Sequence, residues 1–239
     1  MTNPTAAIML IGDEILSGRT QDSNGNYLAK ALFARGIDLR EIRVVGDVAE
    51  TIIATLNTLR DAYDHVFTSG GIGPTHDDIT ADAVAAAFDV PLSERDDALA
   101  ALAKNYAGGM DDLTPARRRM ARVPEGARLI HNPVSGAPGF SIGNVHVMAG
   151  VPAVFCAMVD GLLPGLASGV PLLAESLRIA LPESQIATPL AAIAAAFPDL
   201  SFGSYPFIRD GRFGADIVVR GVDKAQISAA LARLREITA

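Results

Sequence analysis

The sequence is poor in the residues that secreted and nucleic-acid-binding proteins use most. It has a single cysteine, Cys156, and fewer basic than acidic residues, 20 against 27. One cysteine excludes an internal disulfide, which fits a reducing cytoplasm. A net charge of −7 does not favour non-specific binding to nucleic acid. An anionic ligand would have to be held locally, by backbone amides, a few arginines or a metal ion.

Long apolar runs are missing too. The first 14 residues have no basic region before their short apolar run, so we expect no export signal. The most apolar later stretch, residues 145–173, contains Asp160 and is interrupted by Pro152, Pro164 and Pro171, which argues against a membrane span. The sequence therefore predicts a soluble cytoplasmic protein with no membrane or nucleic-acid partner.

Several catalytic motifs are absent as well. The glycine-rich segment 70–73 lacks the Gly-Lys-Ser/Thr of a P-loop, and His76 stands where a Rossmann fingerprint needs its third glycine. No Cys or His pairs have structural zinc spacing, and no Gly-x-Ser-x-Gly elbow is present. Cys156 lies among apolar residues, where we expect a buried structural thiol.

What the chain does contain is a regular alternation of short apolar runs and helical patterns. Hydrophobic residues make up 49% of the sequence and charged residues 20%, enough for a sizeable core. Alternation of this kind predicts right-handed βαβ units, a three-layer α/β fold with a parallel sheet and helices on both faces. The strands are predicted at 6–11, 37–45, 63–67 and 144–149, and the helices after 24, at 50–62, 79–88, 93–106 and 152–163.

A second, smaller domain is predicted after a Pro- and Gly-rich connection. Beyond it the pattern changes to βαββα, typical of a small α+β domain. We therefore expect one domain over residues 1–165 and another over 172–239. The strands of the second are predicted at 176–181, 201–208 and 215–220, and its helices at 183–197 and 224–237.

The segment from Thr68 to Asp82 combines a predicted strand end, a glycine-rich turn and a helix start. Its glycines let the backbone approach a ligand, and a helix start offers free amides to a phosphate. Asp77 and Asp78 follow at once. Carboxylates repel phosphate unless a cation lies between them, so the pattern suggests a phosphorylated ligand with a divalent metal. The alternative is structural, because Thr75 and Asp78 also fit a helix capping box.

Other predicted strand ends carry similar residues. Parallel sheets bind ligands beyond the carboxyl ends of their strands, so Gly12-Asp13-Glu14, Gly46-Asp47 and Gly150-Val151-Pro152 are expected to share one crevice with the glycine turn. Arginines at 117, 118, 119 and 122 form a cluster that is typical of a solvated helix face or, less often, of an anion contact.

Taken together, these motifs resemble a known family. TSGGIGPTHDDITADAV resembles the glycine-rich signature of the molybdopterin-binding domain shared by MoaB, MogA and the N-terminal half of CinA. IGDEILSGRTQDSN, VVGD, HNPVSGAPGF and AGVP are similar, in the same order, to motifs of the CinA branch and of the related domain of eukaryotic FAD synthases. GSYPF at 203–207 resembles the segment that follows this domain in CinA-type chains. Ser135-Gly136 departs from the usual Gly-Thr, and the arginine cluster is denser than in the family.

The resemblance implies a nucleotide or pterin ligand and a homo-oligomer. The CinA branch implies metal-dependent hydrolysis of ADP-ribose or FAD to release AMP, with Mg, Mn or Co. Two alternatives are molybdopterin binding or adenylylation in molybdenum-cofactor metabolism, and a non-catalytic nucleotide-binding module.

The resemblance also implies roles for individual residues. Catalysis would involve Asp13, Asp77 and Asp78, and the metal ligands would come from Asp13, Glu14, Asp47 and Asp78. Asp22 and Asn24 would contact a ribose or, as we prefer, cap the first helix. His76 would contact phosphate or face solvent. The ligand would contact Gly12, Asp22, Asn24, Gly70, Gly71, Gly73, Pro74, Thr75, Gly136, Gly150 and Pro152.

Overall fold

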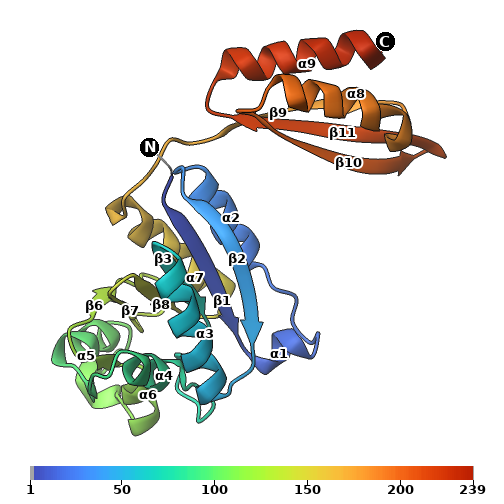
Figure 1. Ribbon diagram of the computed structural model, residues 1–239. Helices are drawn as coiled ribbons and strands as arrows, with labels where there is room; N and C mark the ends of the chain where they lie inside the picture. The colour runs from blue at the N-terminus through green and yellow to red at the C-terminus, as the bar shows by residue number, and fades with distance from the viewer. Residues whose placement is uncertain (1–2, 239) are drawn as a thin grey trace. The chain divides into compact units, whose positions relative to one another are not determined.

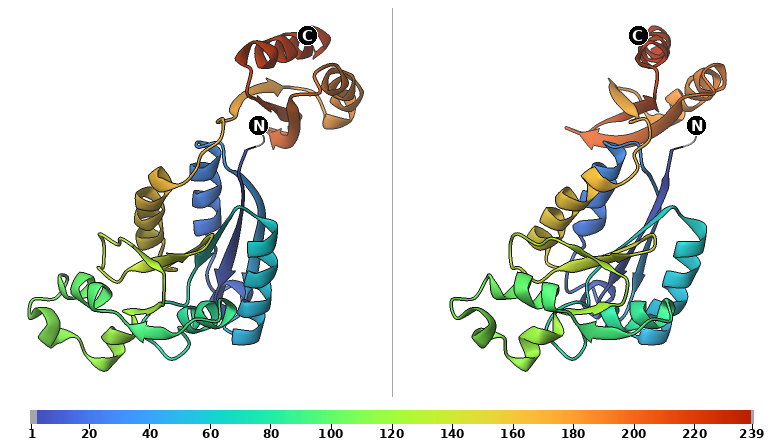
Figure 2. Two further views of the ribbon diagram at one scale, coloured as in Figure 1. Left: turned by 60° about the vertical axis from the view of Figure 1, so that its left-hand side comes forward. Right: turned by 90° about the vertical axis from the view of Figure 1, so that its left-hand side faces the viewer.

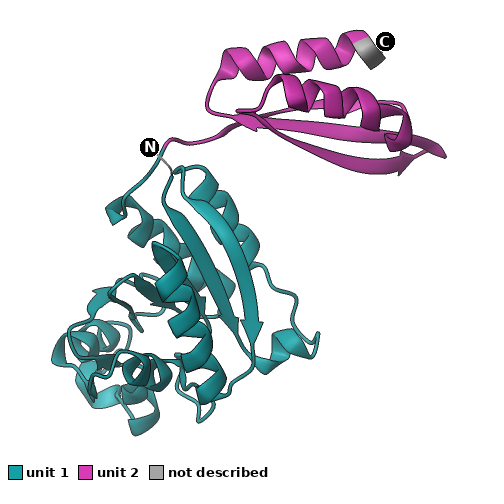
Figure 3. Ribbon diagram, in the orientation of Figure 1, with its two compact units in different colours: residues 1–169 teal, residues 170–239 magenta. Residues whose placement is uncertain are grey.

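A computed structural model describes residues 3–238 of the chain. The chain divides into two compact units, residues 1–169 and 170–239 (Figure 3). Each has its own hydrophobic core.

The first unit is built on a six-stranded sheet in the order β2-β1-β3-β8-β7-β6 (Figure 1). The four strands β2, β1, β3 and β8 are parallel, as the sequence predicts, and β7 pairs antiparallel with both β8 and β6, so that only β7 runs against the other strands of this sheet. The sequence did not predict β6 and β7, because these short strands lie in Pro- and Gly-rich surroundings. The strands are β1 (Thr5–Ile11), β2 (Asp38–Val45), β3 (His65–Ser69), β6 (Arg128–Ile130), β7 (Gly139–Ile142) and β8 (Val145–Met148).

Helices cover both faces of this sheet, as predicted (Figure 2). On one face α2 (Asn24–Phe33) and α7 (Pro152–Leu162) pack together, and on the other α3 (Ala49–Ala62) and α4 (Thr80–Ala87) do so. The remaining elements of the unit are α1 (Asp13–Leu16), β4 (Leu92–Glu94), α5 (Asp96–Ala103), η1 (Gly109–Asp112), α6 (Pro115–Arg119), β5 (Arg122–Pro124) and η2 (Leu163–Gly165).

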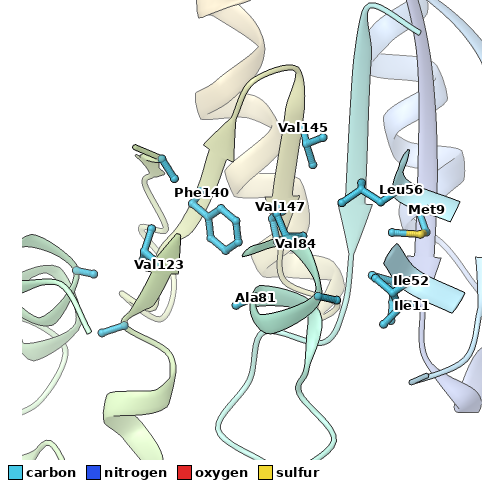
Figure 4. Packing of buried hydrophobic residues seen from close by; sticks show 14 of the residues in the cluster. Met9, Ile11, Ile52, Leu56, Ala81, Val84, Val123, Phe140, Val145 and Val147 are labelled. Carbon is cyan, nitrogen blue, oxygen red and sulfur yellow. The ribbon is translucent and has the colours of Figure 1, made fainter. Parts of the chain in front are cut away.

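The central strand β1 shows why the sheet needs both helical layers. Successive side chains of a strand point to opposite faces; Met9 packs with Ile52 and Leu56 of α3 (Figure 4), whereas Ile8 packs with Leu28 of α2. All five side chains are fully buried. Burying such a side chain stabilises the fold by roughly 1.5–3 kcal/mol. The two packed faces hold the carboxyl ends of the strands in place.

The second unit has the predicted βαββα order. Its antiparallel sheet runs β10-β11-β9, and α8 and α9 pack on it through a core that includes Ile186, Ile193, Ile217, Ile227 and Leu231 (Figure 1). The elements are β9 (Leu173–Ile179), α8 (Glu183–Ala196), β10 (Ser201–Arg209), β11 (Arg212–Gly221) and α9 (Lys224–Thr238).

Two features of the described residues bear on the expectations about membranes and cysteine chemistry. Within residues 3–238 no helix is long and apolar enough to cross a membrane. Cys156 on α7 is partly rather than fully buried, and burial raises the pKa of its thiol. A raised pKa keeps the thiol protonated and poorly reactive, in keeping with a structural role.

Candidate functional site

The carboxyl ends of three neighbouring strands open into one cleft of about 500 Å³. β1 ends at Ile11, β3 at Ser69 and β8 at Met148, and these strands lie side by side in the sheet. The structure thus brings together most of the strand-end motifs that the sequence singled out. The cleft is lined by Ile11, Gly12, Glu14, Asp47, Gly70–Pro74, Asp77, Asp78, Met120, Asn132, Ser135, Ala137, Ala149–Val151 and Val154.

The glycine turn is folded tightly against its surroundings. Gly70 has φ +111°, and its N–H donates to the Met148 carbonyl at 3.1 Å, so this amide is not free for a ligand. A Cβ on Gly70 would lie 2.2 Å from the Ile11 carbonyl oxygen. A glycine at position 70 therefore allows the end of β3 to lie close to β1. Because its N–H is bonded to Met148, Gly70 does not offer an amide to a ligand, contrary to the expected contact.

The next three amides of the turn have no partner within residues 3–238. The N–H groups of Gly71, Ile72 and Gly73 make no hydrogen bond there, and all three residues line the cleft. Successive unpaired amides in a turn with a positive-φ residue form an anion-binding concavity; here Gly71 has φ +71°. This part of the turn can accept a phosphate.

Thr80 closes the turn, a role that the sequence did not predict. Its N–H donates to the Gly71 carbonyl at 2.9 Å, and its buried hydroxyl donates to the Gly70 carbonyl at 3.0 Å. A Cβ on Gly71 would lie 2.0 Å from the Thr80 hydroxyl oxygen. The only signal in the sequence was its place two residues after Asp78, where the family signature also has a threonine.

Asp78 lines the cleft but is engaged by the turn itself. The Thr75 N–H and hydroxyl both donate to Asp78 Oδ2, at 2.8 and 2.5 Å. α4 begins only at Thr80, and its capping residue, Ile79, has no side-chain cap. The Thr75–Asp78 contact is therefore not a helix capping box; it stabilises the loop that carries Pro74 and exposed His76 along the cleft.

Three further carboxylates, Glu14, Asp47 and Asp77, line the cleft. Burial raises the pKa of the Asp47 carboxyl; the hydrogen bond from the Asp13 N–H, at 3.0 Å, opposes this shift, and the charges of Asp13, Glu14 and Asp77 add to it. The negative groups therefore crowd around Asp47. Asp13 contributes mainly through its backbone, because its side chain lies against Gly46 and does not line the cleft.

This donor set matches a hard divalent cation in kind but is not arranged as a complete cage. Oxygen ligands are those that Mg²⁺ prefers, and Mg²⁺ usually binds through one or two carboxylates plus waters and substrate phosphates. Within the described residues no three His, Cys, Asp or Glu side chains converge to hold a metal ion by themselves. The carboxylates thus fit a cation that arrives with a phosphorylated ligand.

The start of α2 supports the cleft from one side. Asp22 accepts the N–H groups of Asn24 and Gly25 at 2.9 and 3.1 Å, which is the predicted capping role. The buried Asn24 amide donates to Ser69 Oγ at 2.8 Å and to the Gly150 carbonyl at 2.7 Å. Asn24 therefore ties the end of β3 to the loop after β8, and neither Asp22 nor Asn24 lines the main cleft.

Gly12, Gly150 and Pro152 all lie at this end of the sheet, in different roles. Gly12 lines the cleft, but its N–H is bonded to the Val45 carbonyl at 3.0 Å. Gly150 also lines it, packed close to Gly70. Pro152 opens α7 and, like Asp22 and Asn24, lines a small side hollow beside the cleft.

The opposite wall comes from the 131–138 loop and from Met120, none of which the sequence assigned to the site except Gly136. Buried Asn132 holds this loop, because its Oδ1 accepts the N–H groups of Val134 and Ser135 at 3.0 and 3.1 Å. Gly136 itself packs against the C-terminal end of α5 and the residues just after it, where a Cβ would lie 1.7 Å from the Asn105 side-chain nitrogen. Gly136 is outside the cleft lining, contrary to the expected ligand contact.

Comparison with known proteins agrees with this geometry. Residues 7–168 match the family model described as a probable molybdopterin binding domain, and residues 171–238 match the middle domain of FAD synthase. The chain belongs to the molybdopterin-binding domain family, of the type found in CinA-like proteins and FAD synthases. The resemblance drawn from the motifs is thereby confirmed.

Individual relatives are likewise FAD synthases and CinA-like proteins. The chain is 32% identical to a probable FAD synthase of Caenorhabditis elegans over 98% of this chain and 50% of that protein, and 34% identical to a CinA-like protein of Myxococcus xanthus over 82% and 50%. It thus spans about half the length of these curated relatives. The crystal structure of CinA, of unknown function, from Thermoplasma acidophilum covers 69% of this chain and 99% of its own, with 34% identity and a TM-score of 0.64.

Proposed function

We propose that this protein is a metal-dependent nucleotide pyrophosphatase that cleaves ADP-ribose or FAD and releases AMP. The observation that supports this best is the meeting, in one cleft, of three unpaired turn amides with four carboxylates and, within the described residues, no basic side chain in the lining. Amides suit the diphosphate, whereas the carboxylates require a cation between themselves and it. The names of the relatives agree with a nucleotide ligand.

Each group of the cleft then has a part in the reaction. The amides of Gly71, Ile72 and Gly73 hold the diphosphate, and Asp78 fixes the loop that presents them. A divalent cation, when bound, neutralises charge that develops on the phosphates. Glu14 and Asp77 would hold it. Asp47, which accepts the Asp13 N–H and whose pKa is raised by burial, would take a proton from the attacking water.

The test is AMP release by the purified protein from ADP-ribose or FAD with Mg²⁺, Mn²⁺ or Co²⁺. Asp47→Asn and Asp78→Asn should each slow release by about 100-fold or more, because one removes the base and the other loosens the turn. Asp61→Asn, at the exposed end of α3, is the matched control and should leave the rate unchanged. A wild-type protein that releases no AMP with any of these metals would refute the hydrolase.

The family model favours one other function, the binding or adenylylation of molybdopterin. The cleft also has an apolar wall, including Ile72, Met120 and Val154, that suits a flat ring. Mass spectrometry of ligand that co-purifies from a host making the cofactor distinguishes the two functions. Retained molybdopterin or its adenylate, with no AMP release from the dinucleotides, would favour this alternative. A non-catalytic module would instead keep its ligand binding after Asp78→Asn.

A further inference from the structure

The cleft contains four carboxylates and, within the described residues, no basic side chain in its lining. The acids are Glu14, Asp47, Asp77 and Asp78. A diphosphate adds more negative charge to this group. Neutral amides and one divalent cation leave the combined charge negative, so a further cation near the glycine turn would strengthen binding.

The arginine cluster lies beside this turn, and three of its four members have internal partners. Arg117 donates to the Asp112 carbonyl at 2.6 Å and stacks on Tyr106. The other two form ion pairs, Arg118 with Glu94, at 2.8 and 2.5 Å, and Arg122 with Asp82, at 2.9 and 2.7 Å. These contacts serve the fold and differ from the predicted solvated helix face, because the arginines are half-buried and Arg122 lies on β5.

Arg119 differs from its neighbours. Its guanidinium makes no ion pair with any carboxylate in the described residues, and its one hydrogen bond, from Nη2 to the Asp78 carbonyl, is long at 3.4 Å. Its Nε is buried without a partner, as is the Nε of Arg122, whose other nitrogens are paired with Asp82. A guanidinium has five N–H donors, and buried donors left unpaired are costly. Arg119 therefore has unused donors at a half-buried position.

The position of Arg119 relates these donors to the glycine turn. It lines a small hollow together with Gly71, Gly73, Asp78 and Met120, and those four residues also line the main cleft. The hollow and the cleft thus share the residues of the glycine turn, so Arg119 borders the same turn that carries the unpaired amides.

We propose that Arg119 is the cationic contact for the phosphate groups of a nucleoside diphosphate bound at the Gly71–Gly73 amides. This inference rests on the proposed nucleotide ligand. Arg suits the role because its planar fork pairs with phosphate oxygens and it stays charged when partly buried. The hydrogen bond from Arg119 to the Asp78 carbonyl also links α6 to the loop that contains Asp78.

The test measures binding rather than turnover. Isothermal titration of the full chain with inorganic pyrophosphate and with AMP, with and without Mg²⁺, should show Arg119→Gln binding about 10-fold or more weakly. Arg119→Lys should recover part of the loss, because lysine keeps the charge but not the fork. Arg118→Gln, one residue away and paired with Glu94, is the matched control and should bind like the wild type.

The outcomes separate this inference from the proposed activity. Equal affinity of Arg119→Gln and wild type, an equal loss in Arg118→Gln, or a wild type that binds neither ligand would each overturn it. Weaker binding by Arg119→Gln in a protein that never releases AMP would support the phosphate contact while refuting the hydrolase. Circular dichroism shows whether Arg119→Gln is folded. If it is unfolded, the comparison of Arg119→Lys with the wild type at raised salt decides. Equal affinity for pyrophosphate would overturn the proposed contact between the guanidinium and phosphate, and weaker affinity of Arg119→Lys would support it.

Discussion

At the scale of single residues, the glycines show how a correct motif can have several physical roles. The sequence predicted that Gly70, Gly71 and Gly73 let the backbone approach a ligand. In the structure a Cβ would meet protein atoms at all three: the Ile11 carbonyl, the Thr80 hydroxyl and the Asp78 carboxylate. Only the amides of Gly71 and Gly73 remain free. The glycines are needed first so that the turn can pack closely against β1 and α4, and the unpaired amides are the part of it that we propose binds phosphate.

A buried histidine makes stability depend on pH. His146 on β8 lies 2.9 Å from Ser141 Oγ and 3.3 Å from His65, and its ring is tilted against that of Phe67. Burial, and to a lesser extent the charges of His65 and Arg128, lowers its pKa from 6.5 to about 3. Between these values the unfolded chain binds a proton that the folded chain does not, so the free energy of unfolding falls as pH decreases below about 6.5.

We expect His146→Gln to flatten this dependence. The contribution of one such group reaches about 1.4 kcal/mol per pH unit, and urea unfolding between pH 7 and 4 measures it. His65, whose pKa is also lowered by burial, keeps part of the slope. His131→Gln is the control, because that side chain is exposed. A variant at His146 with the wild-type slope would contradict the assignment.

At the scale of elements, the connection from β3 to α4 is the part of the fold that makes the site. The chain leaves the sheet at Gly71, runs along the cleft through residues 72–79, and returns where Thr80 bonds to Gly71 and Gly70. This closure is independent of the Thr75–Asp78 contact inside the loop.

Replacing Thr80 tests that closure. Thr80→Val removes the hydroxyl but keeps the shape, and leaves the buried Gly70 carbonyl without this donor, so we expect a loss of about 1–3 kcal/mol in the free energy of unfolding. Thr58→Val, an exposed residue of α3 whose hydroxyl donates to the Ala54 carbonyl, should change stability by only about 0.5 kcal/mol or less. Equal effects of the two substitutions in chemical denaturation would argue against a special role for Thr80.

At the scale of the whole molecule, the ligand cleft and the second unit are built from separate parts of the chain. All residues that line the cleft belong to the first unit, and the second has its own core of Ile, Leu, Val and Ala side chains. The homo-oligomeric state and the cytoplasmic location stay predictions.

Separate cores lead to a prediction for truncation. A fragment of residues 1–169 should fold cooperatively and bind pyrophosphate with about the affinity of the full chain, because no cleft residue is removed. Thermal unfolding monitored by circular dichroism and titration of the fragment provide the measurements. An unfolded fragment, or one that binds more than about 10-fold more weakly, would show that residues 170–239 contribute to the site.

What the sequence determined by itself was the order of the longer helices and strands, the parallel part of the sheet and the strand ends that meet in the cleft. These follow from local periodicity and from the rule that parallel strands bring their carboxyl ends to one edge. Family motifs added the likeness to CinA and FAD synthase domains. None of this required knowing how side chains pack.

Only the tertiary structure decided which of these residues face the cleft. It placed Asp13, Asp22, Asn24, Gly136 and Pro152 in supporting positions, and it brought in Met120, Asn132 and Ser135 from a segment whose short strands have no clear period. It also distinguished Arg119 from three neighbours of the same type. Such distinctions depend on contacts between residues far apart in the sequence, such as the one from Arg119 to Asp78, which no local pattern specifies.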